Sequence, residues 1–198
     1  MMFARTVWIG TVLAAVMLGQ AACESSPGVR TVSPAVQPAE LGETENVHIC
    51  QDVLFSAQPD QASFATLGEQ NYRSVLNLRS DREMAELDFD EAALVTEQGI
   101  TYYHVGVAGA DGLTDDVLDR VRRILRDPGN RPILVHCATA NRVGAVWYAH
   151  RVLDAGLDDS EALAEARKIG LRSADLEQRA RDYIARERER RQHRTRVN

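Results

Sequence analysis

Cysteine is scarce in this chain of 198 residues, which contains only three. A fold built on disulfides needs more of them, and the sequence has neither a CxxC pair nor an HExxH motif. A disulfide scaffold, a zinc site of these types and thioredoxin-like chemistry are therefore disfavoured, and we expect no metal. Each cysteine has to be interpreted by itself.

Long apolar runs are also lacking. The longest, Val7 to Leu18, is too short for a membrane-spanning helix of about 20 residues. Arg5 precedes it and small residues ending in Cys23 follow it, which predicts a signal peptide over 1–22. The segment Leu18-Gly19-Gln20-Ala21-Ala22-Cys23 resembles a bacterial lipobox. We expect an exported protein, periplasmic or membrane-anchored through a lipid on Cys23; ordinary cleavage nearby and an uncleaved anchor are the alternatives.

An excess of positive charge is missing from most of the chain. Residues 178–198 hold eight Arg and three acidic residues, a net charge of +5, whereas residues 1–177 have a net charge of −11. An acidic body repels phosphate backbones, so we expect no nucleic-acid partner. The basic segment is expected to be a solvated terminal helix and tail, with contact to anionic lipid or a polyanion as the alternative.

The composition is that of one globular domain, with 44% hydrophobic and 26% charged residues. Residues 23–45 are rich in Ser, Pro and Gly without an apolar period, which predicts a flexible tether. The predicted organisation is thus a signal peptide at 1–22, a tether at 23–45, one domain at 46–177 and a basic helix and tail at 178–198.

Short β-branched runs alternate with helical patterns from Val47 onward, which favours an α/β fold with a small, mostly parallel sheet of four to five strands flanked by helices. The expected strands are Val47–Ile49, Val53–Ser56, Ser74–Leu78, Thr101–Val105 and Ile133–Val135. The expected helices begin near Asp60, near Asp90, at Thr114, after the Arg142 region, near Asp159 and at Ser173. Several of these starts have a Ser, Thr or Asp that can cap the helix.

The most informative segment is His136-Cys137-Ala138-Thr139-Ala140-Asn141-Arg142-Val143, which joins the last strand to an Ala- and Val-rich helix. A loop at a helix N-terminus presents backbone N–H groups that bind a tetrahedral anion without a metal. The helix end and the Arg142 guanidinium favour the thiolate form of Cys137, which is the nucleophilic form. Arg142 can bind two phosphate oxygens at once.

These residues resemble the active-site signature of the cysteine-dependent protein tyrosine phosphatase superfamily. Upstream segments resemble successive blocks of its bacterial dual-specificity-like branch, which includes the phosphatase-like domain found beside β-lactamase-like hydrolases. Those segments are Ser56-Ala57-Gln58-Pro59, Ser74-Val75-Leu76-Asn77-Leu78-Arg79 with Glu83, and Gly99-Ile100-Thr101-Tyr102-Tyr103-His104-Val105. The similarity spans residues 47–170.

The resemblance implies a phosphatase-like fold and a phosphocysteine intermediate on Cys137, with no cofactor. It implies that Arg142 is the phosphate clamp and that His136 orders the loop. The remaining residues of the phosphate-binding loop are Ala138, Thr139, Ala140, Asn141 and Val143.

The sequence departs from the family pattern in three ways. Four residues instead of five separate Cys137 from Arg142, a spacing also used by rhodanese-like sulfurtransferases. Val143 replaces the usual Ser or Thr, although Thr139 is a substitute candidate. The family's catalytic acid is an Asp on the loop before the preceding helix, and Asp111 is the natural candidate, with a turn-forming role as the alternative.

Arg79, which ends a central strand, is a further candidate for contact with the anion; a surface ion pair with Asp81 or Glu83 is the alternative. Cys50 is expected to be a buried small residue, with a disulfide to Cys137 as the other reading. The leading functional hypothesis is an exported hydrolase of phosphomonoesters, of protein or small-molecule origin. The alternatives are sulfur transfer through a Cys137 persulfide and a non-catalytic module that binds an anion or a partner.

Overall fold

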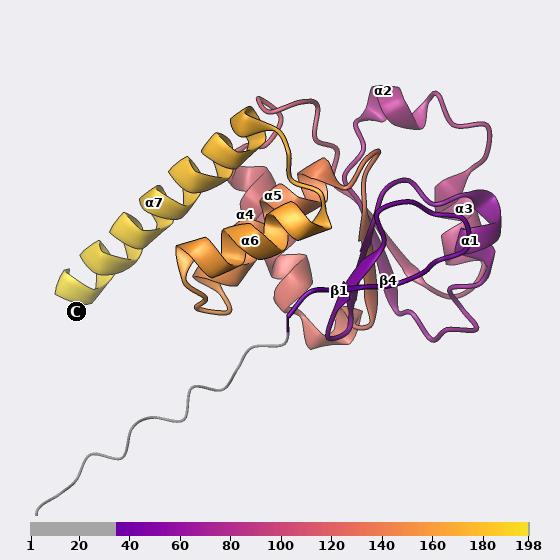
Figure 1. Cartoon of the computed structure of the whole chain (residues 1–198), viewed down its shortest axis with the longest axis horizontal. Coiled ribbons are helices and arrows are strands. Elements are labelled where there is room, and N and C mark those ends of the chain that lie inside the picture. The colour runs from indigo at the N-terminus through magenta and orange to yellow at the C-terminus, as the bar shows by residue number, and fades with distance from the viewer. Residues whose placement is uncertain (1–34, 198) are drawn as a thin grey trace, which may run out of the picture. The chain divides into compact units, whose positions relative to one another are not determined.

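The computed structural model describes residues 35–197. The expected signal peptide, Cys23 and the first part of the expected tether lie outside the described residues. Within the described part, a six-stranded sheet has the order β1-β2-β3-β6-β4-β5 and is flanked by helices (Figure 1). The fold is the predicted α/β class.

The sheet is parallel in its larger part. Strands β3 (Val53–Ser56), β6 (Ile133–His136), β4 (Ser74–Asn77) and β5 (Thr101–His104) run parallel, and β1 (Gln37–Pro38) and β2 (His48–Cys50) add an antiparallel extension at one side. The register pairs His136 with Ser56 on one side and with Asn77 on the other. The carboxyl ends of the parallel strands therefore meet at one edge, where α/β proteins place their sites.

Most helices begin at the caps that the sequence predicts. The side chains of Asp60, Asp90 and Thr114 accept hydrogen bonds from the first turns of α1 (Gln61–Ala65), α3 (Glu91–Thr96) and α4 (Asp115–Arg126). The remaining helices are α2 (Asp81–Met84), the 3₁₀ turn η1 (Pro128–Asn130), α5 (Asn141–Leu153), α6 (Asp159–Ile169) and α7 (Ala174–Val197).

The helices cover the two faces of the sheet unequally (Figure 1). The larger core joins one face to α4, α5, α6 and α7, whereas the smaller core joins the other face to α1 and α3. In α5 the residue Gly144 permits close packing on α6, since a Cβ there would lie 2.6 Å from the Ala166 carbonyl oxygen. Helix α5 is buried from Val143 to Leu153.

The structure corrects the expected tether. Residues 35–45 belong to the folded domain: β1 pairs with β2, and Val36 and Leu41 are buried, one in each core. The Lys168 ammonium also donates to the Val36 carbonyl at 2.6 Å. Two isolated apolar residues in a polar segment have no helical or strand period, so composition alone gave a tether. With this extra strand the sheet has six strands, whereas four or five were expected.

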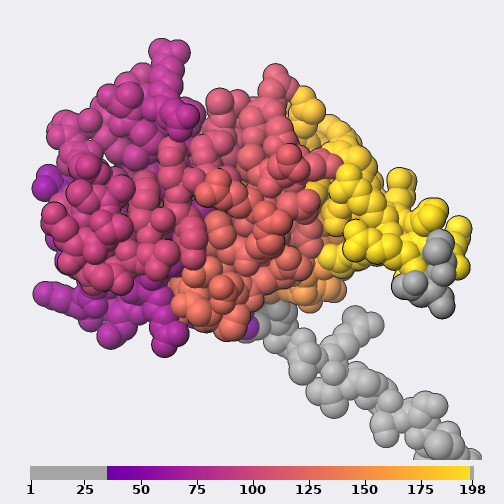
Figure 2. Space-filling model, turned by 180° about the vertical axis from the view of Figure 1, so that it is seen from behind, coloured from indigo at the N-terminus to yellow at the C-terminus, as the bar shows by residue number. Residues whose placement is uncertain are grey.

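Helix α7 packs along the domain and extends beyond it at its C-terminal end (Figures 1 and 2). Its arginines are largely paired with acidic groups of the body: Arg186 with Asp115, Arg188 with Asp159 and Arg179 with Asp111. Positive charges of α7 thus form ion pairs with the acidic body of the same molecule. No helix in the described range 35–197 has both the length and the apolar character to span a bilayer.

Candidate active site

The site is built at the junction of β6 and α5. All four residues of β6 are buried, and its side chains alternate between the two cores: Leu134 packs with α1 and α3, whereas Val135 packs under α5. His136 continues the first set, with its ring 5.5 Å from that of Phe64, and Cys137 belongs to the second. The strand therefore presents the thiol to the helix and the imidazole to the opposite face.

The loop after Cys137 has the features of an anion-binding loop. The backbone N–H groups of Ala138, Thr139 and Ala140 donate to no acceptor in the described part of the chain. Ala140 has φ 63° and ψ 1°, a left-handed conformation that is uncommon for a residue with a Cβ and that turns the chain directly into α5. The Cys137 side chain lies at the base of this turn and is 0% exposed.

Arg142 is held in place by four acceptors. Its two terminal nitrogens donate to the two carboxylate oxygens of Glu83, each at 2.6 Å, and one of them also donates to the carbonyls of Val107 at 2.8 Å and Leu78 at 3.2 Å. Burial lowers the pKa of Arg142, but the hydrogen bonds to Glu83 and the contact with Cys137 outweigh it, so the pKa is raised. A fixed, charged guanidinium thus stands beside the thiol.

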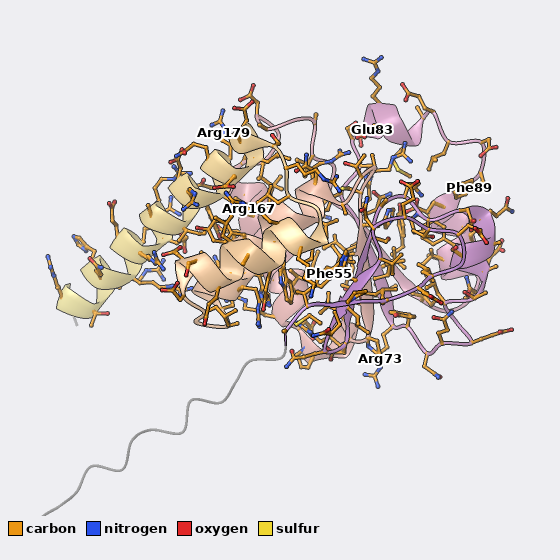
Figure 3. All side chains as sticks on the ribbon, viewed as in Figure 1. Phe55, Arg73, Glu83, Phe89, Arg167 and Arg179 are labelled. Atoms are coloured by element: carbon orange, nitrogen blue, oxygen red, sulfur yellow. The ribbon has the colours of Figure 1, made fainter. Side chains whose placement is uncertain are left out.

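Glu83 is placed by a local motif. Ser80 caps α2 by accepting from the Glu83 N–H, and the Glu83 carboxylate accepts from the Ser80 N–H in return, which forms a capping box. The hydrogen bonds from Arg142 lower the pKa of Glu83 to about 2. Figure 3 labels Glu83 on the segment that carries α2. The sequence analysis assigned Glu83 no such role, although the Ser-x-x-Glu spacing is a signal for the cap.

Arg79 is buried at the same edge rather than paired on the surface. Its side chain is held by the Gln58 amide oxygen at 2.7 Å and the Glu83 carbonyl at 2.8 Å, and it makes no salt bridge to Asp81 or Glu83 within the described chain. Its buried Nε donates to no acceptor in the described residues. Arg79 therefore keeps one buried N–H that is not hydrogen-bonded within the described residues.

Other predicted loop residues have structural partners. The Asn141 amide oxygen accepts from the N–H groups of Arg172 at 2.9 Å and Ser173 at 3.2 Å, so this side chain fastens the start of α7. Val143 is fully buried in the larger core, and Thr139 is exposed. The hydroxyl that the usual signature has after its Arg is replaced here by a packed methyl-bearing side chain.

Asp111 lies apart from these groups. Its carboxylate is 93% exposed and pairs with Arg179 of α7, and it contacts neither Cys137 nor Arg142 in the described chain. The loop that carries it does reach the site, because the Val107 carbonyl accepts from Arg142. Cys50 is buried and burial raises its pKa; no disulfide joins it to Cys137.

Glu91, the first residue of α3, is a site residue that the sequence did not indicate. Its buried carboxylate faces the His136 ring at 2.9 Å. Burial raises the pKa of Glu91, but the neighbouring His136 and several hydrogen bonds lower it by more, so the pKa lies below its usual value. An acidic residue directly after an Asp cap gives no sequence signal of this role, because first-turn carboxylates are common at helix starts.

A cavity of about 530 Å³ opens beside Glu91 and is separate from the Cys137 loop. It is lined by Met84, Leu87, Asp88, Phe89, Asp90, Glu91, Ala92, Tyr102 and His104. No group of three or more His, Cys, Asp or Glu side chains in the described residues is arranged to hold a metal ion.

The chain is similar in sequence to the "Beta-lactamase hydrolase-like protein" of two strains of Xylella fastidiosa. It is 30% identical to each over 129 residues, which are 63% of this chain and 30% of the relative. The chain thus corresponds to less than a third of the length of these curated relatives. No family model matches the sequence.

Three solved structures with the same fold carry the phosphatase name or a phosphorylated ligand. The catalytic core of the PP-IP phosphatase Siw14 from S. cerevisiae, in complex with citrate, has a TM-score of 0.59 and 24% identity over 80% of this chain and 96% of that one. TpbA of P. aeruginosa in complex with pTyr has a TM-score of 0.59 and 22% identity over 78% and 90% of the two chains. Tk-PTP in its active form has a TM-score of 0.54 and 20% identity over 68% and 92%.

At these identities the likeness concerns the fold. The described chain therefore has the fold of the protein tyrosine phosphatase-like phosphatases, as its His-Cys loop and Arg implied, and its sequence is related to the beta-lactamase hydrolase-like proteins of Xylella.

Proposed function

We propose that this protein is a cysteine-dependent phosphatase that hydrolyses phosphomonoesters through a phosphocysteine intermediate on Cys137. The observation that supports it is the junction of β6 and α5, which brings together the Cys137 thiol, the Arg142 guanidinium and three backbone N–H groups that have no acceptor among the described residues. Such an arrangement favours a tetrahedral dianion over a neutral or cationic substrate.

In the proposed reaction the Cys137 thiolate attacks phosphorus and the bond to the ester oxygen breaks. The three non-bridging oxygens are held by the loop N–H groups and by Arg142, which follow the charge into the transition state. A water molecule then attacks phosphorus, the phosphorus–sulfur bond breaks, and inorganic phosphate and the thiolate are released. Residues of this chain supply all the protein groups that these two reaction steps need, and no cofactor is involved.

Asp111 is our proposed general acid for the departing oxygen. Its loop contacts Arg142 through Val107, but its carboxylate is paired with Arg179 at the surface. Proton donation therefore requires that Asp111 leave Arg179 and turn toward the anion-binding loop when substrate is bound. Arg79, whose Nε is buried without an acceptor in the described chain, is proposed as an accessory donor to the phosphate.

The direct test is hydrolysis of p-nitrophenyl phosphate by the full-length, reduced protein beside its Cys137→Ser variant. We expect turnover by the first and none by the second, while both retain the same thermal unfolding midpoint. Turnover retained by Cys137→Ser would remove Cys137 from the mechanism. A phosphotyrosine peptide and small phosphomonoesters, compared by kcat/KM, would then define the substrate class.

Sulfur transfer is the second candidate, and the four-residue spacing from Cys137 to Arg142 favours it. In that reaction thiosulfate would leave its outer sulfur on Cys137 as a persulfide and release sulfite, and cyanide would take the sulfur as thiocyanate. Thiocyanate formation that depends on Cys137, without phosphate ester turnover, would establish this alternative. Binding of inorganic phosphate with neither reaction would indicate an anion-binding module.

We further propose that the protein is exported and carries a lipid on Cys23, on the strength of the sequence pattern of residues 1–23. Mass spectrometry of the protein from membranes of a bacterial host tests this. A Cys23→Ala variant is expected to lose the lipid mass and to appear in the soluble fraction. An unmodified Cys23 in the wild-type protein would contradict the proposal.

A further inference from the structure

Glu91 occupies an unusual place in the sheet. Its carboxylate, 0% exposed, accepts hydrogen bonds from four side chains. The donors are Asn77 at 2.8 Å, Tyr102 at 2.9 Å, His136 at 2.9 Å and Gln58 at 2.9 Å. A buried carboxylate that accepts four hydrogen bonds has its charge compensated by its partners, and each partner is fixed in turn.

The four donors come from the four parallel strands. Asn77 and His136 are the last residues of β4 and β6, Tyr102 lies in β5, and Gln58 follows β3 by two residues. Glu91 thus joins the carboxyl ends of β4 and β6 to the Tyr102 side chain of β5 and to the segment that follows β3. No other side chain in the described part of the chain joins these four strands by hydrogen bonds.

Two connections lead from this group to the reactive loop. His136 is bonded directly to Cys137 in the chain, and the Gln58 N–H donates to the Ala138 carbonyl at 3.4 Å. A third runs through Arg79, which donates to the Gln58 amide oxygen at 2.7 Å and to the carbonyl of Glu83, the residue that holds the phosphate clamp. The base of the loop and the clamp are therefore fixed to one buried carboxylate.

We propose that Glu91 is a positioning residue that fixes Cys137 and its loop by joining the ends of β4 and β6 to β5 and to the segment after β3. The predicted effect of Glu91 on catalysis rests on the proposed function. Its predicted effect on the order of the loop does not. Position 91 requires a side chain that accepts hydrogen bonds and donates none. All four partners donate to it, and Gln58 cannot turn its amide around, because its oxygen already accepts from Arg79.

This polarity gives a sharp experiment on the full-length protein. In Glu91→Gln the new amide N–H₂ faces the N–H₂ of Gln58, so one hydrogen bond is lost and two donors meet. In the double variant Gln58→Glu with Glu91→Gln, the new carboxylate at position 58 accepts from both the amide at 91 and Arg79, which restores this pair, although the hydrogen bond from the Gln58 amide to the Pro59 carbonyl at 3.0 Å is lost. Glu165→Gln is the matched control, because Glu165 is a mostly buried carboxylate paired with Arg151 away from the loop.

We expect Glu91→Gln to lower kcat for p-nitrophenyl phosphate by about tenfold or more, because the thiol and the loop N–H groups lose their fixed geometry. The double variant should have a kcat at least about threefold above that of Glu91→Gln, and Glu165→Gln should leave the wild-type kcat unchanged. A folded Glu91→Gln protein with wild-type kcat would overturn the proposal. So would a folded double variant that fails to recover.

A second readout does not depend on turnover. The Leu78 N–H donates to the His136 carbonyl at 2.9 Å and the Gly144 N–H to the Ala140 carbonyl at 3.0 Å, so their exchange with deuterium reports on both ends of the loop. We expect about tenfold faster exchange at these amides in Glu91→Gln and no change in Glu165→Gln. If the wild-type protein has no phosphatase activity, this measurement still decides the role of Glu91.

If Glu91→Gln does not fold, Tyr102→Phe replaces it in the exchange measurement. This variant removes one donor and no charge, and we expect about threefold faster exchange at Leu78 and Gly144. Unchanged exchange at both amides would overturn the proposal.

Discussion

Glu83→Gln tests whether the phosphate clamp is set in advance by its ion pair. The carboxylate makes two hydrogen bonds of 2.6 Å to Arg142, and the pKa of Glu83 is lowered to about 2. Set against an ordinary value near 4.5, that depression corresponds to about 3 kcal/mol, or about 2 kcal/mol once partial exposure is allowed for. We expect Glu83→Gln to lower the free energy of unfolding by about this amount.

The same change should lower kcat/KM for p-nitrophenyl phosphate by about tenfold to hundredfold, because Arg142 keeps its bonds to the Leu78 and Val107 carbonyls but loses its planar partner. The control is Glu177→Gln, which removes the ion pairs of Glu177 with Arg167 and Arg181 and should cost at most about 1 kcal/mol per pair with no effect on rate. Steady-state kinetics and urea unfolding measure both effects. If Glu83→Gln retains wild-type kcat/KM, Arg142 does not depend on Glu83 for its position.

The pH dependence of this stability difference has a definite sign. The pKa of Glu83 is depressed in the folded protein, so its contribution is complete above about pH 4.5 and is lost as the pH falls toward 2. The gap in unfolding free energy between the wild type and Glu83→Gln should therefore be constant from pH 7 to about pH 5 and narrow below that. A gap that widens on acidification would refute the reasoning.

Three further substitutions test other parts of the molecule. Arg142→Lys should lower kcat/KM about hundredfold, because an ammonium cannot donate in parallel to two oxygens; unchanged kinetics would exclude the clamp. Asp111→Asn should lower kcat about hundredfold for an alkyl phosphate but much less for p-nitrophenyl phosphate, whose leaving group needs no proton; equal effects on both esters would exclude Asp111 as the acid. Asp154→Asn should cost about 3 kcal/mol in urea unfolding, because the buried Arg122 guanidinium loses its nearest carboxylate, at 2.6 Å, and keeps only Asp119 at 3.6 Å and Glu187 at 3.9 Å; a cost below about 1 kcal/mol would mean that these two compensate the charge of Arg122.

Local signals in the sequence predicted most of the fold. The caps Asp60, Asp90 and Thr114 and the strand Val53–Ser56 are confirmed, because each depends on residues that are neighbours in the chain. Strand β1 was missed because two residues have no period of their own and become a strand only by pairing with β2. The four-residue helix α2 is likewise too short for a helical pattern, although its capping box is visible in the sequence.

The candidate site could be predicted only where it is contiguous in the chain. The segment from His136 to Arg142 indicated the loop and its place between a strand and a helix. Glu83 and Glu91 could not be assigned their roles, since they meet their partners across 59 and 45 residues of chain, respectively. Asp111 was chosen by its place in the loop order, and the structure adds a partner, Arg179, that no local pattern indicates.

The position of α7 has a consequence for the order in which the protein can fold during synthesis. Ala180, Tyr183 and Ile184 of this helix fill the larger core beside α5, and Asn141 at the start of α5 caps the turn into α7. A nascent chain therefore exposes the apolar surface of α5 until α7 has left the ribosome. Residues 137–142 are synthesised before the helix that packs on α5, so we expect the reactive loop to take its final shape only after α7 has been translated.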